Sequence, residues 1–562
     1  MLKRYAATFL LPFFFASCRQ QQAADLIIYN GVVYTVDSAF TMAEAIAVKD
    51  GDIVAVGTSK DIQERYKATE MVDAHGQAVY PGLIDAHAHF LGYGRSRYEV
   101  GLYECTNWAA AIEKVKAYAA RDTKVLWIRG RGWDQNLYPG KEYPDNKELN
   151  ELFPDRPVLL DRIDGHAAIA NAKALELAGI TADTKLTGGK VEVKNGKPTG
   201  LLIDNVVDLV ARIVPKPTRA EHEQWLGTAE ADCYALGVTT VADCGLPYED
   251  VMMIDSLQRE GKLNMNLYVM LSDDGSTYKK YMQWRATALA GNDADARKHF
   301  AGEGPYKTSK MYVRGVKAYA DGALGSRGAC LLKHYADKPG WGGFLLSPPE
   351  HFDSLAQMLV GTDMQLCTHA IGDSGNRMAL HIYKRHLQGR NDKRWRIEHA
   401  QVVDPADIDM FGECSVVPSV QPTHATSDMY WAGDRLGADR IRTAYAYKQL
   451  LQQNGWLPLG TDFPVEEISP FRTFLAATAR VDAKGYPEGG FQPQEALSRE
   501  EALRGMTIWA AKGCFMENEV GSIEVGKKAD LVIMDKDLMK AAPGDVLKTK
   551  VVATYARGRK MK

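Results

Sequence analysis

The sequence predicts an α/β protein whose central part is a (β/α)8 TIM barrel. Strand-like apolar segments alternate with helical segments through most of the chain, as in a parallel sheet covered by helices. Eight such strand candidates fall within residues 81–510, and eight is the number that closes this barrel. Short strand patterns at both chain ends, within residues 24–80 and 511–562, predict one small β-sandwich built from both ends.

Length and composition set the broad class of protein. The 562 residues suffice for two or three domains with a large core. The chain is 46% hydrophobic and 25% charged, which is typical of a folded globular protein. The formal net charge is -3 and no basic patch stands out, so we expect no nucleic acid as a partner.

Residues 1–17 are predicted to be a lipoprotein signal peptide. Lys3 and Arg4 precede an apolar run, Ala6 to Phe15, that is too short to span a bilayer comfortably. Small residues then directly precede Cys18, which we expect to be the lipidated first residue of the mature chain. The protein would be an exported bacterial lipoprotein, on the periplasmic side or the cell surface, held to a membrane only by this anchor. The alternative is an ordinary secretory signal in which Cys18 is incidental.

The other cysteines do not indicate a disulfide framework, despite the export signal. They are scattered and odd in number, with no CxxC pair. The set is Cys105, Cys233, Cys244, Cys330, Cys367, Cys414 and Cys514.

Both chain ends have the alternation and turns of β-structure. Residues 26–29 and 32–36 flank Asn30-Gly31 and predict a hairpin, and residues 45–48 and 53–56 predict a second one. Two independent β-flaps, one at each end, are the alternative to a shared sandwich.

Several of the eight predicted barrel strands end in polar side chains. The eight strands are predicted at residues 83–87, 237–243, 266–271, 313–319, 365–369, 395–399, 415–420 and 457–462. Residues from about 99 to 219 do not fit the barrel period, and we expect them to form an insertion after the first strand that covers the site.

The most informative stretch is Pro81 to Phe90, which contains His87 and His89. Residues i and i+2 of a strand point to the same face, so the two imidazoles lie side by side, as a metal ion requires. Two unrelated histidines at a strand end are the alternative.

Placed at the carboxyl ends of the predicted strands, the candidate metal ligands meet at one barrel mouth. They are His87, His89, Lys317, His369, His399 and Asp462. Four neutral imidazoles suit Zn2+ or another borderline divalent ion. Taken singly, His369 or His399 could instead be a hydrogen-bonded core histidine.

These segments, in this order, resemble the amidohydrolase superfamily. The PGLIDAHAHF, RGVKAYADGALGSRGA, THAIGD, RIEHAQ and GTDFPV blocks look like its family-3 branch, which includes N-substituted formamide deformylases. The resemblance covers nearly the whole chain after Cys18, and it also implies the shared β-sandwich and the insertion.

The resemblance implies two divalent metal ions, with Zn2+ the expected ion. His87 and His89 would bind one, and His369 and His399 the second. A lysine in a buried strand is costly unless it is neutralised or paired. In related proteins the equivalent of Lys317 is carboxylated and bridges the metals. The alternative is a lysine paired with a carboxylate such as Asp321, in which case the site would hold a single metal.

The resemblance gives Asp462 the roles of metal contact and proton shuttle; a helix N-cap is its alternative. Glu398 precedes His399 directly, so we expect it to point to the opposite strand face and to be structural.

The insertion and nearby loops hold the candidate substrate-binding residues. His166, in the Asp161–Ala167 segment, is expected to polarise the substrate carbonyl or hold a carboxylate; a loop histidine that caps the next helix is the alternative. Weaker candidates are Trp133, Ser326, Arg327 and Trp431, each of which could simply be packing.

Together these features predict a metal-dependent hydrolase of a non-peptide amide C–N bond, such as an N-substituted formamide. Divalent metals would lower the pKa of a water molecule to near neutrality. A deaminase, a cyclic-amide hydrolase or an ester hydrolase would use the same scaffold. The remaining alternative is a non-catalytic solute-binding lipoprotein. The expected partner is a small-molecule amide, and a homodimer is compatible with the sequence.

Overall fold

The computed structural model describes residues 21–121, 126–291 and 294–562. The predicted signal peptide and Cys18 lie outside these residues. Within them, no helix is both long and apolar enough to cross a membrane.

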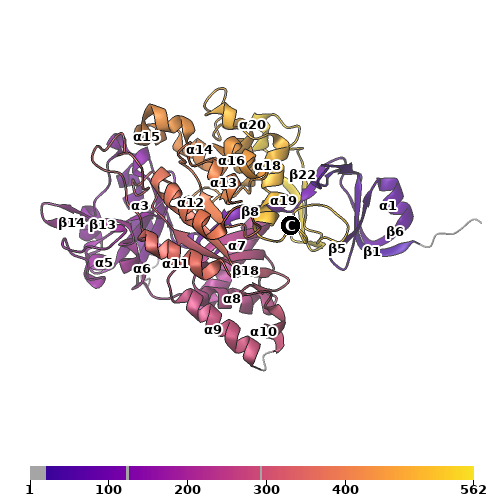
Figure 1. Cartoon of the computed structure of the whole chain (residues 1–562), viewed down its shortest axis with the longest axis horizontal. Helices are drawn as coiled ribbons and strands as arrows, with labels where there is room; N and C mark the ends of the chain where they lie inside the picture. Colours follow the sequence, from indigo (N-terminus) through magenta and orange to yellow (C-terminus); the bar gives the residue numbers. More distant parts are fainter. Residues whose placement is uncertain (1–20, 122–125, 292–293) are drawn as a thin grey trace, which may run out of the picture.

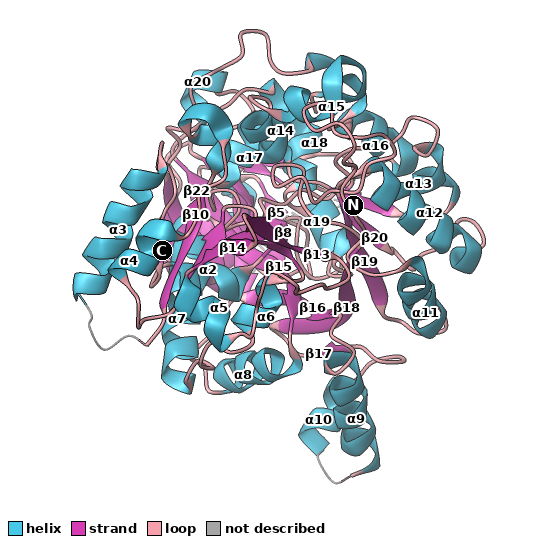
Figure 2. Ribbon diagram, turned by 90° about the vertical axis from the view of Figure 1, so that its left-hand side faces the viewer, coloured by secondary structure: helices cyan, strands magenta, loops and turns pink. Residues whose placement is uncertain are grey.

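A parallel sheet forms the centre of the molecule and confirms the predicted barrel (Figure 2). Its neighbouring strands pair in chain order from β8 through β15, β16, β18, β19 and β20 to β21. Their bounds are Leu83–Ala88, Val238–Leu246, Asn266–Ser272, Met311–Tyr319, Gln365–Ala370, Arg396–His399 and Val417–Ser419.

The eighth predicted strand, residues 457–462, closes the barrel without being a regular strand. Val420 and Leu459 form an isolated parallel bridge, and the Ala86 N–H donates to the Leu459 carbonyl at 3.1 Å. The segment therefore contacts both β21 and β8. Pro458 lacks an N–H donor and Asp462 has a φ of 64°, so the full hydrogen-bond ladder of a strand cannot form here.

Helices cover the outside of the barrel (Figure 2). They include α7 (Arg219–Ala235), α8 (Tyr248–Arg259), α11 (Pro349–Leu359), α12 (Asp373–Leu387), α16 (Tyr447–Asn454) and α17 (Pro470–Ala479). Helix α7 begins with a capping box in which Thr218 and Glu221 bond to each other's backbone N–H groups.

Two sheets from the chain ends pack face to face at one end of the molecule (Figure 1). The first, in spatial order, is β5 (Asp52–Gly57), β4 (Ala45–Lys49), β1 (Gln22–Tyr29) and β6 (Tyr66–Asp73). The second is β24 (Arg559–Lys560), β23 (Val551–Ala556), β22 (Leu531–Met534), β7 (Ala78–Pro81), β2 (Val32–Tyr34) and β3 (Met42–Ala43). The antiparallel pairing of Val79 with Ile533 joins the two chain ends in one sheet, which excludes two independent flaps.

One predicted hairpin is wrong. The strands on either side of Asn30-Gly31 do not pair: β1 pairs with β4 and β6, whereas β2 pairs with β3 and β7 in the other sheet. The chain crosses between sheets here, so that Ile28 and Val33 pack in the same core. The second predicted hairpin, β4 with β5, is confirmed.

Between β8 and β15 the chain forms a separate six-stranded sheet. In spatial order it is β13 (Gly189–Lys194), β14 (Lys197–Asp204), β12 (Ala167–Ala170), β11 (Val158–Arg162), β10 (Ile128–Trp133) and β9 (Val100–Gly101). This sheet lies at the opposite end of the molecule from the β-sandwich (Figure 1). It is tied to the loop after β18 by Gln135, which donates to the Gly325 carbonyl at 3.3 Å, and by Tyr143, whose hydroxyl donates to the Ser326 carbonyl at 3.0 Å.

Candidate metal centre and active site

The His87–His89 pair stands at the end of β8, where Asp85 holds it against the closing segment of the barrel. Asp85 accepts the Thr461 hydroxyl at 2.6 Å and the backbone N–H groups of Thr461 and His87 at 3.0 and 3.1 Å. One buried carboxylate thereby fixes the backbones that carry His87 and Asp462.

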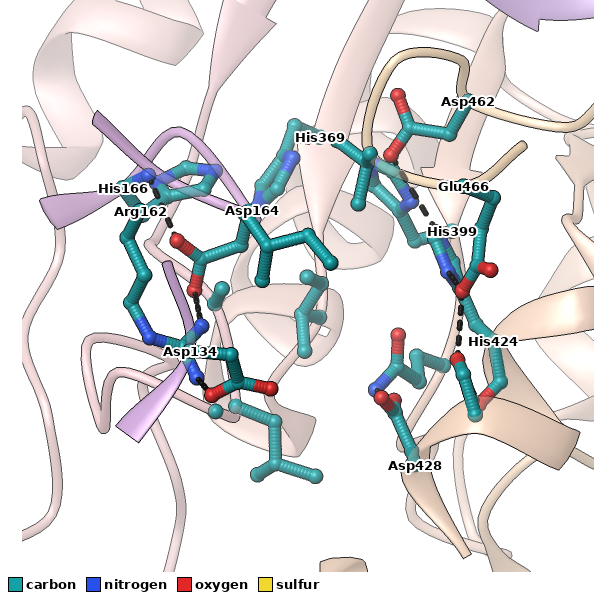
Figure 3. Close-up of a pocket in the computed structure, with 18 of the residues that line it drawn as sticks. Asp134, Arg162, Asp164, His166, His369, His399, His424, Asp428, Asp462 and Glu466 are labelled. Atoms are coloured by element: carbon teal, nitrogen blue, oxygen red, sulfur yellow. Dashed lines mark hydrogen bonds and ion pairs between the residues drawn. The ribbon is translucent and has the colours of Figure 1, made fainter. Parts of the chain in front are cut away.

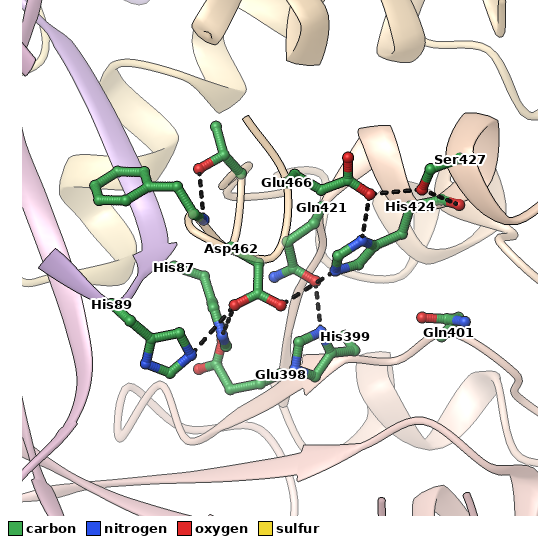
Figure 4. Close-up of polar contacts among 12 residues, drawn as sticks. His87, His89, Glu398, His399, Gln401, Gln421, His424, Ser427, Asp462 and Glu466 are labelled. Atoms are coloured by element: carbon green, nitrogen blue, oxygen red, sulfur yellow. Dashed lines mark hydrogen bonds and ion pairs between the residues drawn. The ribbon is translucent and has the colours of Figure 1, made fainter. Parts of the chain in front are cut away.

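Asp462 lies between imidazoles on both of its oxygens (Figure 4). Its Oδ1 is 3.5 Å from His87 Nε2 and 3.3 Å from His89 Nε2. Its Oδ2 is 3.3 Å from His424 Nε2. The predicted pair of histidines and the predicted shuttle carboxylate are thus in contact although they are far apart in sequence.

The other predicted imidazoles join this group. The rings of His369 and His399 have centroids 4.5 Å apart, and those of His399 and His87 are 4.7 Å apart. Lys317 is buried on β18, with its Nζ 4.9 Å from the centroid of the Tyr319 ring.

The alternative pairing of Lys317 with Asp321 is wrong. Asp321 instead accepts backbone N–H groups of Ile371, Gly372 and Cys330 at 2.8 to 2.9 Å. This carboxylate fixes the loop that follows His369. Among the described residues, no ion pair to Lys317 is found.

The residues fit a divalent metal ion. Among the described residues, His87 Nε2, His369 Nε2 and Asp462 Oδ1 are buried atoms without a hydrogen-bond partner. Buried polar atoms are rarely left unpaired in folded proteins. The ligand atoms of His87, His89 and Asp462 also lie within 4.8 Å of one another. Imidazole nitrogens and a carboxylate oxygen are ligands that Zn2+ and similar ions accept.

Glu398 corrects one prediction, since it does not point away from the site. Its Oε2 lies 2.5 Å from His87 Nδ1, and its Oε1 lies 2.7 Å from Arg396 Nε. The strand alternation fails because His399 has a φ of 74° and leaves the β-conformation. Burial raises the pKa of Glu398, but Arg396 and His87 outweigh it and lower the pKa to about 2. The ionised carboxylate orients His87 so that Nε2 faces the other imidazoles.

Two further site residues were not predicted. His424 lies on α14 (Pro422–Asp428), and its Nδ1 is 3.1 Å from Glu466 Oε1. Burial lowers the pKa of His424, but Asp462 and Glu466 raise it to about 10. The second residue is Gln421, whose Oε1 accepts a hydrogen bond from His399 Nδ1 at 2.8 Å. The sequence feature that could have indicated these two residues is the segment from Gln421 to His424, which directly follows the seventh predicted strand.

A cavity of about 140 Å³ opens over these residues (Figure 3). Asp134, Arg162, Asp164 and His166 come from the inserted sheet and its loops, and they face His424, Asp428 and Glu466 across the cavity. The predicted residues that line it are His89, His166, Lys317, His369, His399, Trp431 and Asp462.

His166 is held by a buried carboxylate. Its Nδ1 lies 2.7 Å from Asp204 Oδ1, and its ring centroid is 5.0 Å from that of His369. The alternative that His166 caps the next helix is wrong. Asn171 caps α5 (Ala172–Leu177) by accepting the Ala174 N–H at 3.0 Å.

Three predicted substrate contacts do not reach the cavity. Trp133 is fully buried in the inserted sheet, and its Nε1 donates to the Leu160 carbonyl at 2.7 Å. Ser326 is buried and donates to the Ala323 carbonyl, and Arg327 forms an ion pair with Asp337 at 2.8 Å. Each of these side chains is already used in packing or pairing.

The sequence model of the amidohydrolase family matches residues 70–561. The chain belongs to this family. Members of this family are metal-dependent hydrolases, and the family membership identifies this protein as a hydrolase.

Three comparisons place this amidohydrolase among known proteins. It is 32% identical to the protein LONG AFTER FAR-RED 3 of Arabidopsis thaliana, over 96% of this chain and 91% of that protein. It is 26% identical to the N-substituted formamide deformylase of Arthrobacter pascens, over 96% and 98%. The crystal structure of an uncharacterised metal-dependent hydrolase from Pyrococcus horikoshii OT3 matches with a TM-score of 0.73 at 26% identity, covering 92% of this chain and 99% of that one.

Proposed function

We propose that this amidohydrolase cleaves the C–N bond of a small non-peptide amide, with N-substituted formamides as the first class to test. The observation that carries the proposal is the position of Asp462, whose Oδ1 faces His87 and His89 at the floor of the cavity. A carboxylate at this place can accept a proton from water and return it to a leaving nitrogen. The similarity to the N-substituted formamide deformylase of Arthrobacter pascens supports the choice of amide.

We propose two divalent ions, Zn2+ by preference, as the cofactors. His87, His89 and Asp462 would hold one ion, and His369 and His399 the other. Lys317 would bridge them as a carbamate formed with CO2. This is supported by the burial of Lys317 beside the imidazoles and by the lack of an ion pair to it among the described residues, because a carbamate can bind metal ions whereas an ammonium group would repel them. When bound, the ions supply Lewis-acid polarisation and lower the pKa of water.

The protein residues have separate roles in the proposed reaction. Glu398 and Gln421 hold the imidazoles of His87 and His399 through their Nδ1 atoms. Asp462 moves the proton from water to the departing nitrogen. His166, fixed through Nδ1 by Asp204, presents its other ring nitrogen to the substrate carbonyl. One water is consumed, the C–N bond breaks, and a carboxylate and an amine are released.

The proposal is tested on protein that begins after Cys18, loaded with Zn2+ and supplied with a panel of N-substituted formamides and matched formate esters. We expect release of the amine together with one equivalent of formate. Hydrolysis of the esters alone would contradict the assignment to amides. Lack of turnover on the whole panel would contradict hydrolysis of formamides and of formate esters alike.

We also propose that the mature chain is an exported lipoprotein anchored through Cys18. This is supported by the apolar run and the small residues before Cys18.

A further inference from the structure

The cavity has more negative than positive side chains in its wall. Five carboxylates line it, those of Asp134, Asp164, Asp428, Asp462 and Glu466. The positively charged side chains in the same wall are Arg162, Lys317 and His424, whose pKa Asp462 and Glu466 raise to about 10 against the effect of burial. Asp462 and Lys317 belong to the floor of the cavity, so the substrate meets the remaining charges first.

Arg162 is already paired with two carboxylates before a substrate binds. Its Nε donates to Gln135 Oε1 at 2.7 Å, and one terminal nitrogen donates to Asp164 at 2.5 Å. The other terminal nitrogen is paired with Asp134. The positive charge on this side of the cavity is thus matched by two carboxylates.

Asp428 lies on the facing wall of the cavity and, unlike Arg162, is hydrogen-bonded to neutral groups. Its Oδ2 accepts the Tyr445 hydroxyl at 2.8 Å and the Gln401 amide at 3.1 Å, and both donors are neutral. Among the described residues no cation forms an ion pair with Asp428, and no hydrogen bond to its Oδ1 is found. Burial, together with the negative charges of Glu466 and Asp134, raises the pKa of Asp428 to about 7, although His424 and the Tyr445 hydroxyl act to lower it.

Trp431 lies beside Asp428 and supplies an aromatic surface. Its backbone N–H donates to the Asp428 carbonyl at 2.9 Å, and its side chain lines the same cavity. A carboxylate next to an indole ring is suited to an ammonium group, because the charge and the ring quadrupole both attract a cation. The Trp431 ring already contacts one cation in this way, since Arg435 Cζ lies 5.5 Å from the ring centroid.

The position of Asp428 sets the length of the ligand. It lies four residues after His424 on α14, hence about one helical turn, or roughly 6 Å, further along the axis. His424 contacts Asp462 at 3.3 Å. A ligand that reaches from Asp462 to Asp428 therefore spans on the order of 6–9 Å, the length of an alkyl chain of about four to six carbons.

We propose that Asp428 and Trp431 form a binding site for a substrate ammonium group, so that the substrate class is the mono-N-acylated diamine, in particular the N-formyl diamine. This inference rests on the proposed amide hydrolysis. The reaction then consumes one water, breaks the formyl C–N bond, and releases formate and a diamine that carries two ammonium groups.

The test compares two formamides of equal length. N-(5-aminopentyl)formamide carries the cation, and N-hexylformamide has a methyl group in its place. We expect kcat/KM at least tenfold higher for the cationic compound at pH 8 and low salt. Asp428→Asn keeps similar hydrogen-bonding groups but removes the charge, and it should bring the ratio of the two kcat/KM values close to one. Glu467→Gln, an exposed carboxylate paired with Arg472, is the matched control and should keep the ratio.

A binding measurement separates this inference from hydrolysis itself. Calorimetry should show hexylamine binding at least tenfold more tightly than hexan-1-ol, and Asp428→Asn should abolish the difference. If Asp428→Asn does not fold, Trp431→Leu serves as the second variant and should reduce the difference at least threefold.

The outcomes distinguish the two proposals. Hexylamine binding through Asp428 without hydrolysis of either formamide would uphold the cation site and overturn the amide hydrolase. Equal kcat/KM values for the two formamides, or a preference for anionic 6-formamidohexanoate, would overturn the cation site while the hydrolase stands.

Discussion

Glu398 Oε2 lies 2.5 Å from His87 Nδ1, and this contact joins two residues that are 311 positions apart. Because the carboxylate occupies Nδ1, only Nε2 of His87 remains to face His89, His399 and Asp462. The same carboxylate pairs with the fully buried Arg396. Glu398 therefore links the barrel interior to the candidate metal centre.

Replacing Glu398 with Gln should weaken metal binding about 10- to 100-fold, because the residue that orients a ligating histidine is lost. The buried Arg396 would also lose its counter-charge, so the melting temperature should fall. Chelator competition with Zn2+ measures the affinity. The control is Glu413→Gln, an exposed carboxylate paired with Lys384. An unchanged affinity in Glu398→Gln would show that the contact is only structural.

Lys317→Ala should reduce the metal content from two ions to one per chain, because the proposed carbamate bridge cannot form. Elemental analysis of protein purified without chelator measures the content, and 13C NMR after growth with 13CO2 detects the carbamate directly. Lys310→Ala, just before the start of the same strand, should keep two ions. One ion per chain in both the parent and Lys317→Ala would reduce Lys317 to a structural lysine.

Asp462→Asn should lower kcat about 10²- to 10⁴-fold, since an amide oxygen cannot shuttle the proton. The measurement is made at saturating metal, with the metal content determined on the same sample. Asp434→Asn, an exposed carboxylate paired with Lys141, is the control. A normal kcat in metal-saturated Asp462→Asn would assign the proton transfer to another group.

Binding of hexylamine should strengthen as the pH rises through about 7. Burial raises the pKa of Asp428 to about 7, so the carboxyl is neutral below this pH and attracts the ammonium only above it. The groups that act on Asp428 are His424, Tyr445, Glu466 and Asp134. Calorimetry from pH 5.5 to 8.5 tests this, and the trend should be lost in Asp428→Asn. Affinity that falls over this range would place the ammonium elsewhere.

Cys18→Ser should abolish incorporation of labelled palmitate in a bacterial host and release the protein from the membrane fraction. Cys330→Ser, at a cysteine outside the signal, should leave labelling intact. A parent protein without label, found in the soluble fraction, would indicate an ordinary secretory signal instead.

The sequence was informative wherever local spacing decides the outcome. The i, i+2 relation placed His87 and His89 on one strand face, and the order of polar strand ends brought His369, His399 and Asp462 to the same barrel mouth. Alternation failed for Glu398 because His399 leaves the β-conformation, a backbone property that residue types do not specify.

Local patterns also could not settle which strands pair. Asn30-Gly31 has the residues of a hairpin turn, yet burying Ile28 and Val33 in one core requires the chain to cross between sheets. Turn preference amounts to only a small free energy, whereas the sandwich core is shared by strands from both chain ends.

The sequence by itself determined the barrel, the four imidazoles, Lys317 and Asp462, because these depend on strand period and order. Only the tertiary structure decided that Glu398 orients His87, that His424 bridges Asp462 and Glu466, and that Asp428 faces the cavity with hydrogen bonds from the neutral Tyr445 and Gln401. It also removed Trp133, Ser326 and Arg327 from the cavity. These contacts join residues distant in sequence, so they are fixed by barrel closure and by the docking of the inserted sheet rather than by local spacing.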